Sequence, residues 1–203
     1  MCGIAGVLRI SDRPCHRDLA SLATAMSATL KHRGPDADGS WADNDKGIAV
    51  GHRRLSVIDL STSGAQPMLS ASGRYVLSYN GEIYNYRALR KDLVARGTVF
   101  KSNGDTEVLL RGWQEDGREY LSALDGMFAF ALWDDRSQQL WLVRDRIGVK
   151  PLYYALGPDR ISFGSEIKAL LQNQQVLQSH VGTFEKRALL AVTCLLYTSP
   201  SPR

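Results

Sequence analysis

The clearest chemical signal is at the N-terminus, where Cys2 directly follows the initiator methionine. A small second residue permits removal of Met1, which would leave a thiol and a free α-amino group on the same carbon atom. The reference pKa is about 8.5 for a thiol and about 7.7–8.0 for an α-amine, so a neutral amine can accept the thiol proton near pH 7. The pattern is typical of an N-terminal nucleophile that carries its own base. A buried and unreactive cysteine is the alternative interpretation.

The elements that would position Cys2 follow from hydrophobic periodicity and turn residues. We predict a buried strand in CGIAGVLR, an amphipathic helix over 17–31 and a loop over 32–46. Further strands are expected in GIAVGHRRLSVID and RYVLSYNGEIY, and helices over about 86–96, with Gly97 as its C-cap, and from an N-cap at Asp105. Two hairpins are expected, one around DRSQ and one around GPD. Strands and helices are grouped rather than alternating, which favours an α+β fold with largely antiparallel sheet.

Composition limits the classes of protein that fit. The chain has 203 residues, 44% hydrophobic and 23% charged, which argues against disorder and a membrane protein. The longest apolar stretch, Ala188 to Leu196, is too short to span a bilayer, and no cleavable signal precedes Cys2. The net charge of +4 is spread along the chain, which argues against a nucleic-acid partner. Cys2, Cys15 and Cys194 form no metal-ligand or disulfide spacing, so we expect no metal and a cytoplasmic location.

Several long motifs occur in a fixed order along the chain. They are MCGIAG, HRGPDADG (32–39), RLSVIDLSTSGAQPM (54–68), YNGEIYNY (79–86), SNGDTEVLL (102–110), the segment 125–154 from DGMFAFALWD to VKPLYY, and GSEIKALL. With these motifs the chain resembles the N-terminal glutaminase domain of glutamine-hydrolysing asparagine synthetase, a class II glutamine amidotransferase. The resemblance implies an N-terminal-nucleophile hydrolase fold, a four-layer α-β-β-α sandwich of largely antiparallel sheets. It covers residues 2–171.

Residues beyond about 190 do not follow the family, and the region after the last motif, residues 172–203, has a different character. The segment ends in CLLYTSPSPR, which has no amphipathic period. We expect it to be a truncated linker or the start of a synthetase region, with a non-native tail.

The resemblance assigns the catalytic groups. Cys2 would attack the side-chain carboxamide of glutamine, and its amine would shuttle the proton. The side-chain amide of Asn80 and the N–H of Gly81 would stabilise the oxyanion, and loss of one such donor typically costs about 2.7–4 kcal/mol. An isolated Asn-Gly pair is otherwise most often a hairpin turn.

The resemblance also assigns the substrate-binding groups. Arg54 would hold the α-carboxylate of glutamine in a bidentate pair, and Arg53 beside it is the competing position. Asp105, with Glu82 nearby, would bind the α-ammonium group; a helix N-cap is the structural alternative for Asp105. Backbone groups around Leu55, Ser56, Val57 and Ile58 complete the expected binding site. We expect structural hydrogen bonds for His32 and His52, and structural ion pairs or a domain contact for Arg144, Asp145 and Arg146.

Three functions compete. The first is the glutaminase part of an asparagine synthetase, without its synthetase domain, with glutamine as substrate and with ATP and Mg²⁺ used only in the missing domain; a homodimer of the full-length protein is an open expectation. The second is an amidotransferase that supplies ammonia to another pathway. Relatives that act on sugar phosphates or phosphoribosyl groups usually have R-x-A-T-H-G where this chain has RLSVID, which disfavours those two substrate classes, whereas asparagine-synthetase-like enzymes of other pathways share the motif. The third is a non-catalytic interaction domain.

Overall fold

Two antiparallel β-sheets form the centre of the protein, and the computed structural model describes residues 1–10, 18–173 and 176. The five-stranded sheet has the order β2-β3-β1-β9-β8. Its strands are β1 (Gly3–Arg9), β2 (Ala37–Asp43), β3 (Ile48–Arg54), β8 (Tyr153–Leu156) and β9 (Arg160–Gly164). The four-stranded sheet has the order β4-β5-β6-β7, with β4 (Met68–Leu69), β5 (Tyr75–Ile83), β6 (Gly126–Asp134) and β7 (Gln139–Arg144).

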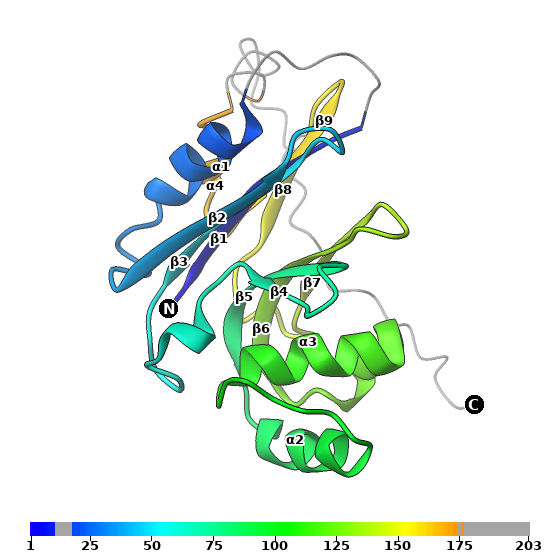
Figure 1. Cartoon of the computed structure of the whole chain (residues 1–203). Coiled ribbons are helices and arrows are strands. Elements are labelled where there is room, and N and C mark those ends of the chain that lie inside the picture. The colour runs from blue at the N-terminus through cyan, green and yellow to red at the C-terminus, as the bar shows by residue number, and fades with distance from the viewer. Residues whose placement is uncertain (11–17, 174–175, 177–203) are drawn as a thin grey trace, which may run out of the picture.

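Helices cover the outer face of each sheet. The α-helices are α1 (Leu19–Ala28), α2 (Tyr86–Ala95), α3 (Asp105–Asp116) and α4 (Ile167–Leu170), and two 3₁₀ helices span Thr62–Gly64 and Gly117–Ala123. Figure 1 shows α1 and α4 on the outside of the five-stranded sheet, and α3 with α2 beyond the four-stranded sheet. The expected four-layer α-β-β-α arrangement is therefore confirmed.

The core explains why several strands lack an alternating pattern. Ile48 and Val50 of β3 pack against Trp133 of β6 between the two sheets. On the outer face, Val7 and Ala49 pack against Leu19 of α1. Both faces of the sheet are covered, so five of the seven residues in each of β1 and β3 are buried, and all but one of these buried residues are small or apolar.

The predicted loop over 32–46 was wrong in part, because Ala37–Asp43 forms strand β2. The strand lies at the edge of its sheet and pairs with β3 from Ala37 opposite Arg54 to Asp43 opposite Ile48. Its sequence, ADGSWAD, is polar and contains glycine, so its local propensity for strand is low. The pairing with the buried β3 supplies the stability that this local sequence lacks.

Most other sequence predictions of elements are confirmed. The first strand, the amphipathic helix over 17–31 and the helix over 86–96 correspond to β1, α1 and α2, and Gly97 follows α2 with φ of 95°. The two expected hairpins are β6–β7 and β8–β9. The predicted linker with a non-native tail covers residues 172–203, of which 174–175 and 177–203 lie outside the described residues.

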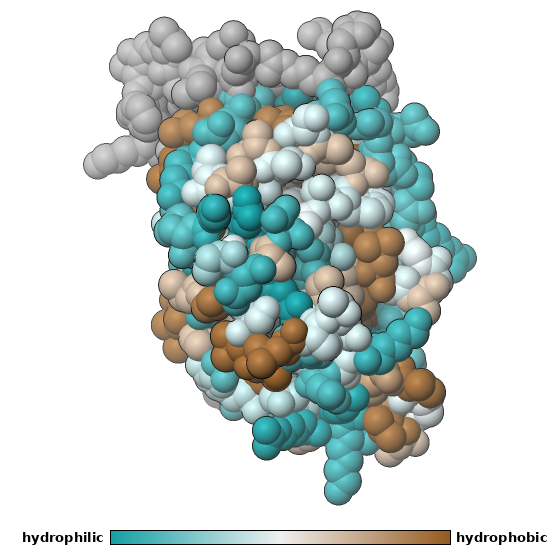
Figure 2. Space-filling model, turned by 60° about the vertical axis from the view of Figure 1, so that its left-hand side comes forward, coloured by the Kyte–Doolittle hydropathy of each residue, from teal (hydrophilic) through white to brown (hydrophobic). Residues whose placement is uncertain are grey.

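The surface carries no single continuous apolar face in the view of Figure 2, where separate hydrophobic patches are divided by hydrophilic side chains. Val57 and Leu60 are two of the exposed apolar residues, at 71% and 77%. Within the described part of the chain, no helix is both long and apolar enough to cross a membrane.

Gly112 is required where α3 packs against the segment that follows it. A Cβ atom at Gly112 would lie 1.9 Å from Cζ of the buried Tyr120 ring. We predict that Gly112→Ala lowers the free energy of unfolding by about 1–2 kcal/mol. Overpacking costs typically about 1–3 kcal/mol, and this outweighs the gain of about 1 kcal/mol in helix propensity. Urea unfolding measures the effect.

Gly104→Ala is the matched control, since its added Cβ would lie 3.5 Å from Cβ of Asp59, an ordinary contact. Gly104 is the N-cap of α3, where alanine is less favourable than glycine, so we expect a loss below about 1 kcal/mol that is smaller than the loss in Gly112→Ala. A Gly112→Ala protein as stable as the wild type would contradict the packing described here.

Candidate active site

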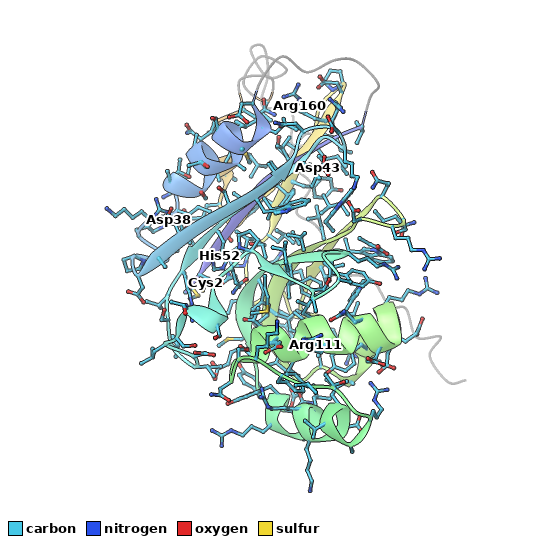
Figure 3. All side chains as sticks on the ribbon, in the orientation of Figure 1. Cys2, Asp38, Asp43, His52, Arg111 and Arg160 are labelled. Atoms are coloured by element: carbon cyan, nitrogen blue, oxygen red, sulfur yellow. The ribbon has the colours of Figure 1, made fainter. Side chains whose placement is uncertain are left out.

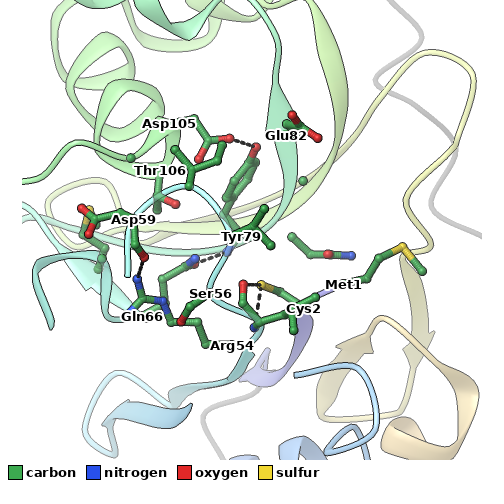
Figure 4. Close-up of a pocket in the computed structure, with 18 of the residues that line it drawn as sticks. Met1, Cys2, Arg54, Ser56, Asp59, Gln66, Tyr79, Glu82, Asp105 and Thr106 are labelled. Carbon is green, nitrogen blue, oxygen red and sulfur yellow. Dashed lines mark hydrogen bonds between the residues drawn. The ribbon is translucent and has the colours of Figure 1, made fainter. Parts of the chain in front are cut away.

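One cavity of about 220 Å³ opens between the two sheets at the N-terminus. Figure 4 shows it in close-up, with Cys2 on one side and Asp105 on the other. All the catalytic and binding residues predicted from the sequence line it, namely Cys2, Arg54, Leu55, Ser56, Val57, Ile58, Asn80, Gly81, Glu82 and Asp105. The volume is below the roughly 300–1,000 Å³ typical of drug-sized ligands, and it suits a small metabolite.

Strand register places Cys2 in this cavity. Gly3 of β1 pairs with Arg53 of β3 in the antiparallel sheet. Cys2 therefore lies beside Arg54, where β3 ends and the chain turns into the 55–61 segment. Figure 3 shows Cys2 at the end of β1, at the level between the two sheets.

The thiol of Cys2 contacts the backbone of Leu55. Its Sγ atom lies 3.7 Å from the Leu55 carbonyl oxygen, to which it donates, and 3.4 Å from the Leu55 nitrogen, which donates to it. Burial raises the pKa of the Cys2 thiol above its usual value. A thiol in this position stays protonated near neutral pH, so it needs a nearby base before it can act as a nucleophile.

Met1 lines the same cavity and is 56% exposed. Burial of its amino group lowers the pKa of that amine below 8.0. An α-amine in this environment is neutral for a larger fraction of molecules at pH 7, which is the state that accepts a proton.

Arg33 holds the backbone of Cys2, a contact that the sequence did not indicate. Its Nε donates to the Cys2 carbonyl oxygen at 3.0 Å, and its Nη1 pairs with Glu166 at 3.0 Å. Glu166 also pairs with His32 and Lys168. Burial raises the pKa of Glu166, but the hydrogen bonds from Arg33, His32 and Lys168 outweigh burial and lower that pKa to about 2. The backbone of Cys2 is thus held by Arg33, in the turn that follows α1, and Arg33 is held in turn by Glu166, between β9 and α4.

Asn80 is a buried donor without a partner. The residue is 1% exposed, and among the described residues its side-chain Nδ2 has no hydrogen-bond acceptor. Leaving such a group unpaired costs about 1–3 kcal/mol, and because Asn80 lines the cavity, a ligand there can supply the missing acceptor. Gly81 follows it in β5, and a Cβ there would lie 2.5 Å from the Met127 carbonyl, so sheet packing alone requires glycine.

Arg54 points into the cavity, whereas Arg53 does not line it. The Arg54 guanidinium donates to the carbonyl oxygen of Ser61 at 2.8 Å and to that of Asp59. Arg53 donates to Asp38 at 3.2 Å on the other side of the strand. The predicted choice of Arg54 over Arg53 therefore agrees with the position of the two side chains, while its role in binding stays a prediction.

Asp105 begins α3, and its predicted capping role was wrong by one residue. The N-cap is Gly104, which has no side chain to cap with. The Asp105 carboxylate instead accepts from the Tyr79 hydroxyl at 2.7 Å and from the Ile83 N–H at 3.0 Å, both on β5. Burial raises its pKa above the usual value. The nearby Glu82 is an exposed side chain on the rim.

His32 and His52 make hydrogen bonds, as expected, outside the lining of the cavity. His32 contacts Glu166 at 2.9 Å, and the fully buried His52 contacts the Tyr79 carbonyl oxygen at 3.0 Å. Arg144 donates to the Lys150 carbonyl at 2.8 Å, and Asp145 accepts from backbone N–H groups of the same turn, including that of Val149 at 2.9 Å. Arg144 and Asp145 therefore both make structural contacts within the turn that follows β7.

The cavity also has lining residues that the sequence reasoning missed. They include Asp59, Gln66, Tyr79, Thr106 and Lys150. All five lie within the motifs named above, so the motifs indicated these positions although not their place in the cavity. Within the described ranges, no group of His, Cys, Asp and Glu side chains is arranged to hold a metal ion.

Comparison with known proteins defines the class. The family model described as "Glutamine amidotransferase domain" matches residues 1–199. The chain therefore belongs to the glutamine amidotransferase domain family. Within this family, the chain is similar to the corresponding part of proteins named asparagine synthetase. It is 40% identical over 178 residues to asparagine synthetase [glutamine-hydrolyzing] 1 of Bacillus subtilis, covering 88% of this chain and 28% of that protein.

A second relative has a different name. The chain is 41% identical over 179 residues to amidase chry2 of Gibberella zeae, covering 84% of this chain and 26% of that protein. The chain thus spans little more than a quarter of the length of these two relatives.

A solved structure supports the fold. Glutamine phosphoribosylpyrophosphate amidotransferase of B. subtilis, complexed with ADP and GMP, has a TM-score of 0.69 and 22% identity, covering 83% of this chain and 43% of that one. The expected N-terminal-nucleophile hydrolase fold is therefore confirmed.

His52 gives the fold a testable pH dependence. Complete burial lowers its pKa from 6.5 to about 4. The unfolded chain therefore binds the proton first as pH falls, and stability is full above about pH 6.5 and is lost toward pH 4. We predict that the free energy of unfolding falls by about 2–3 kcal/mol from this group between pH 7 and 4.5.

Urea unfolding of the wild type and of His52→Gln at both pH values isolates this contribution, since glutamine does not titrate. The variant should lose less stability on acidification than the wild type. Equal losses in the two proteins would show that His52 is not buried in its neutral form.

Proposed function

We propose that the chain hydrolyses glutamine to glutamate and ammonia, with Cys2 as N-terminal nucleophile after removal of Met1. The observation that carries the proposal is that four residues line one cavity: Cys2, Asn80 with its unpartnered amide, Arg54 and Asp105. These are a nucleophile, an oxyanion donor and two groups of opposite charge for an amino acid.

The first step needs the free amine of Cys2. The amine accepts the thiol proton, and the thiolate attacks the carboxamide carbon of glutamine. Collapse of the tetrahedral adduct breaks the C–N bond, and the proton held by the amine leaves with ammonia. Water then attacks the thioester, which releases glutamate and returns the proton to the thiol.

The oxyanion of each tetrahedral adduct needs donors that are already in place. The side-chain Nδ2 of Asn80 supplies one, since it lacks an acceptor within the described structure. The N–H of Gly81 is the second donor that we assign. A preformed, water-excluded donor stabilises the adduct more than water does, because it needs no reorganisation.

The amino-acid end of glutamine is bound by two charged groups. We assign the α-carboxylate to Arg54, and the α-ammonium group to Asp105 with Glu82 at the rim. The backbone of Leu55, Ser56, Val57 and Ile58 lines the wall between Cys2 and Arg54 and supplies further contacts.

The ammonia, we propose, serves the synthetase part of an asparagine synthetase. The relatives of that name, which are three to four times as long as the part matched here, support this assignment. ATP and Mg²⁺ would act in that synthetase part and not in residues 1–203, where no Gly-rich phosphate-binding motif occurs. The limits of the amidotransferase domain at residues 2 and 171, and a homodimer of the longer protein, stay predictions.

A second candidate is an amidotransferase that serves another pathway. The observation that favours it is the 41% identity to a protein named amidase chry2. An ATP-pyrophosphatase motif of the SGGxDS type in the downstream coding sequence would favour an asparagine-synthetase-type enzyme, and product analysis of the longer protein would identify the acceptor.

We predict that Cys2→Ala abolishes ammonia release from glutamine, and that a chain with Met1 retained is nearly as inactive because its Cys2 has no free amine. The assay couples ammonia or glutamate release to a dehydrogenase, with the N-terminus of each protein verified by mass spectrometry. Thermal unfolding controls for loss of fold. Ammonia release by Cys2→Ala at the wild-type rate would remove the nucleophile assignment.

We predict that Arg54→Lys raises KM for glutamine strongly with a smaller effect on kcat, because the carboxylate contact is equal in the ground and transition states. Asn80→Ala should instead lower kcat. Arg53→Lys is the matched control, and its KM should stay near the wild-type value. A larger rise in KM for Arg53→Lys than for Arg54→Lys would show that Arg53, and not Arg54, binds the α-carboxylate of glutamine.

We predict that the chain binds no ATP in the micromolar range and makes no asparagine from aspartate, ATP and ammonia. Isothermal titration with ATP and Mg²⁺ provides the check. Saturable binding, or conversion of ATP to AMP by the purified chain, would overturn the assignment of nucleotide chemistry to another part of the protein.

A further inference from the structure

The guanidinium group of Arg54 is held by a short turn rather than by an acid. Nη1 donates to the Ser61 carbonyl at 2.8 Å, and Nη2 donates to the Asp59 carbonyl. Gly64 closes the turn on the guanidinium, since a Cβ at that position would lie 2.3 Å from Nη2. The orientation of Arg54 therefore depends on the conformation of residues 59–61.

The side chain of Asp59 fixes that conformation. Its Oδ1 accepts from the Ser61 N–H at 2.8 Å and from the Ser61 hydroxyl at 2.6 Å. This is the local aspartate turn, in which the carboxylate bonds the backbone two residues on. The turn presents the carbonyl oxygens of residues 59 and 61 to the same guanidinium.

The second oxygen of Asp59 reaches the opposite wall of the cavity. Oδ2 accepts from the N–H of Asn103 at 3.0 Å, in the segment directly before α3. That segment is itself fixed, because the Glu107 carboxylate accepts from the N–H and hydroxyl of Ser102 at 2.6 and 2.8 Å. Asp105, at the start of α3, is thereby joined to the turn that holds Arg54.

Charge and hydrogen bonding favour this arrangement. The bonds from Ser61 lower the pKa of Asp59, with a smaller contribution from the positive charge of Arg54. The carboxylate is therefore ionised at neutral pH, and it accepts from three donors in two separate segments. Figure 4 shows Asp59 between Arg54 and the start of the helix that carries Asp105 and Thr106.

We propose that Asp59 is a positioning residue for substrate recognition: its carboxylate holds Arg54 and the start of α3 at a fixed separation, so that the α-carboxylate and α-ammonium groups of one amino acid are bound together. This proposal rests on the proposed function, because it takes glutamine as the substrate. Asp59 itself does not touch the reacting atoms.

The test compares Asp59→Ala, Asp59→Asn and the matched control Asp38→Ala, an aspartate that pairs with Arg53 and does not line the cavity. Steady-state kinetics are measured with glutamine and with glutaminamide, in which an amide replaces the α-carboxylate. For Asp59→Ala we expect KM for glutamine to rise about ten-fold and kcat to change less than about two-fold. KM for glutaminamide should rise less than KM for glutamine, because this substrate has no carboxylate contact with Arg54 to lose and keeps only its ammonium contact.

Asp59→Asn keeps one oxygen acceptor for the turn but loses the second, so its KM for glutamine should lie between those of the wild type and Asp59→Ala. Asp38→Ala should behave as the wild type. An unchanged KM in Asp59→Ala overturns the proposal, and so does an equal rise for glutamine and glutaminamide, which shows a general effect on the fold. Asp59→Asn keeps the test valid if Asp59→Ala does not fold.

Binding separates this proposal from the proposed function. Isothermal titration of glutamine into Cys2→Ala and into Cys2→Ala/Asp59→Ala measures affinity without turnover. A weaker affinity in the double variant supports the positioning role even if the wild-type chain releases no ammonia, a result that would remove the proposed function alone. Equal affinities overturn the positioning role and leave the hydrolysis proposal standing.

Discussion

The antiparallel register between β1 and β3 is the constraint on which the site depends. Because Gly3 pairs with Arg53, Cys2, which directly precedes β1, lies beside Arg54 at the end of β3, and its thiol contacts the backbone of Leu55. If β3 were shifted by one residue relative to β1, Arg53 would replace Arg54 beside Cys2, and the core-facing side chains of β3 would turn to the other face of the sheet. The register is fixed by burial on both faces of the sheet, where Val7 and Ile48 each lose all exposure to solvent. Hydrophobic packing far from the cavity therefore determines which groups face the substrate.

The cavity gathers polar groups that destabilise the fold. Asn80 has a buried amide without an acceptor, and Asp105 is buried with a raised pKa. The unpaired amide of Asn80 costs about 1–3 kcal/mol, and burial of the Asp105 carboxylate adds a desolvation cost; the surrounding core must offset both. The same features prepare the site for an amino-acid amide, because donors and charges that are already in place need no reorganisation when the substrate binds. The anchoring contacts come from segments distant in sequence, with Arg33 on the Cys2 carbonyl and Asp59 on the N–H of Asn103.

Much of the fold was predictable from the sequence, and the reasons are local. The β6–β7 and β8–β9 hairpins are apolar runs that flank polar turns, and α1 and α2 have helical periodicity. Strand β2 was not predictable, because its polar sequence forms a strand only through pairing with β3. The residues of the cavity were identified through ordered motifs and their resemblance to a family, and geometry then placed Arg54 rather than Arg53 at the cavity. The contacts of Arg33 and Asp59 join residues 31 and 44 positions apart, and no local pattern encodes such pairs.

Cys2, once Met1 has been removed, is proposed to be the nucleophile that attacks glutamine bound in this cavity. Covalent labelling with 6-diazo-5-oxo-L-norleucine, a diazoketone with the amino-acid end of glutamine, tests it most directly, since attack by the thiolate expels dinitrogen and leaves a stable thioether. Peptide mass spectrometry should find one adduct per chain, on Cys2, suppressed by excess glutamine and absent when Met1 is retained. Labelling confined to Cys15 or Cys194, or equal labelling of Cys2 with Met1 in place, would contradict the account.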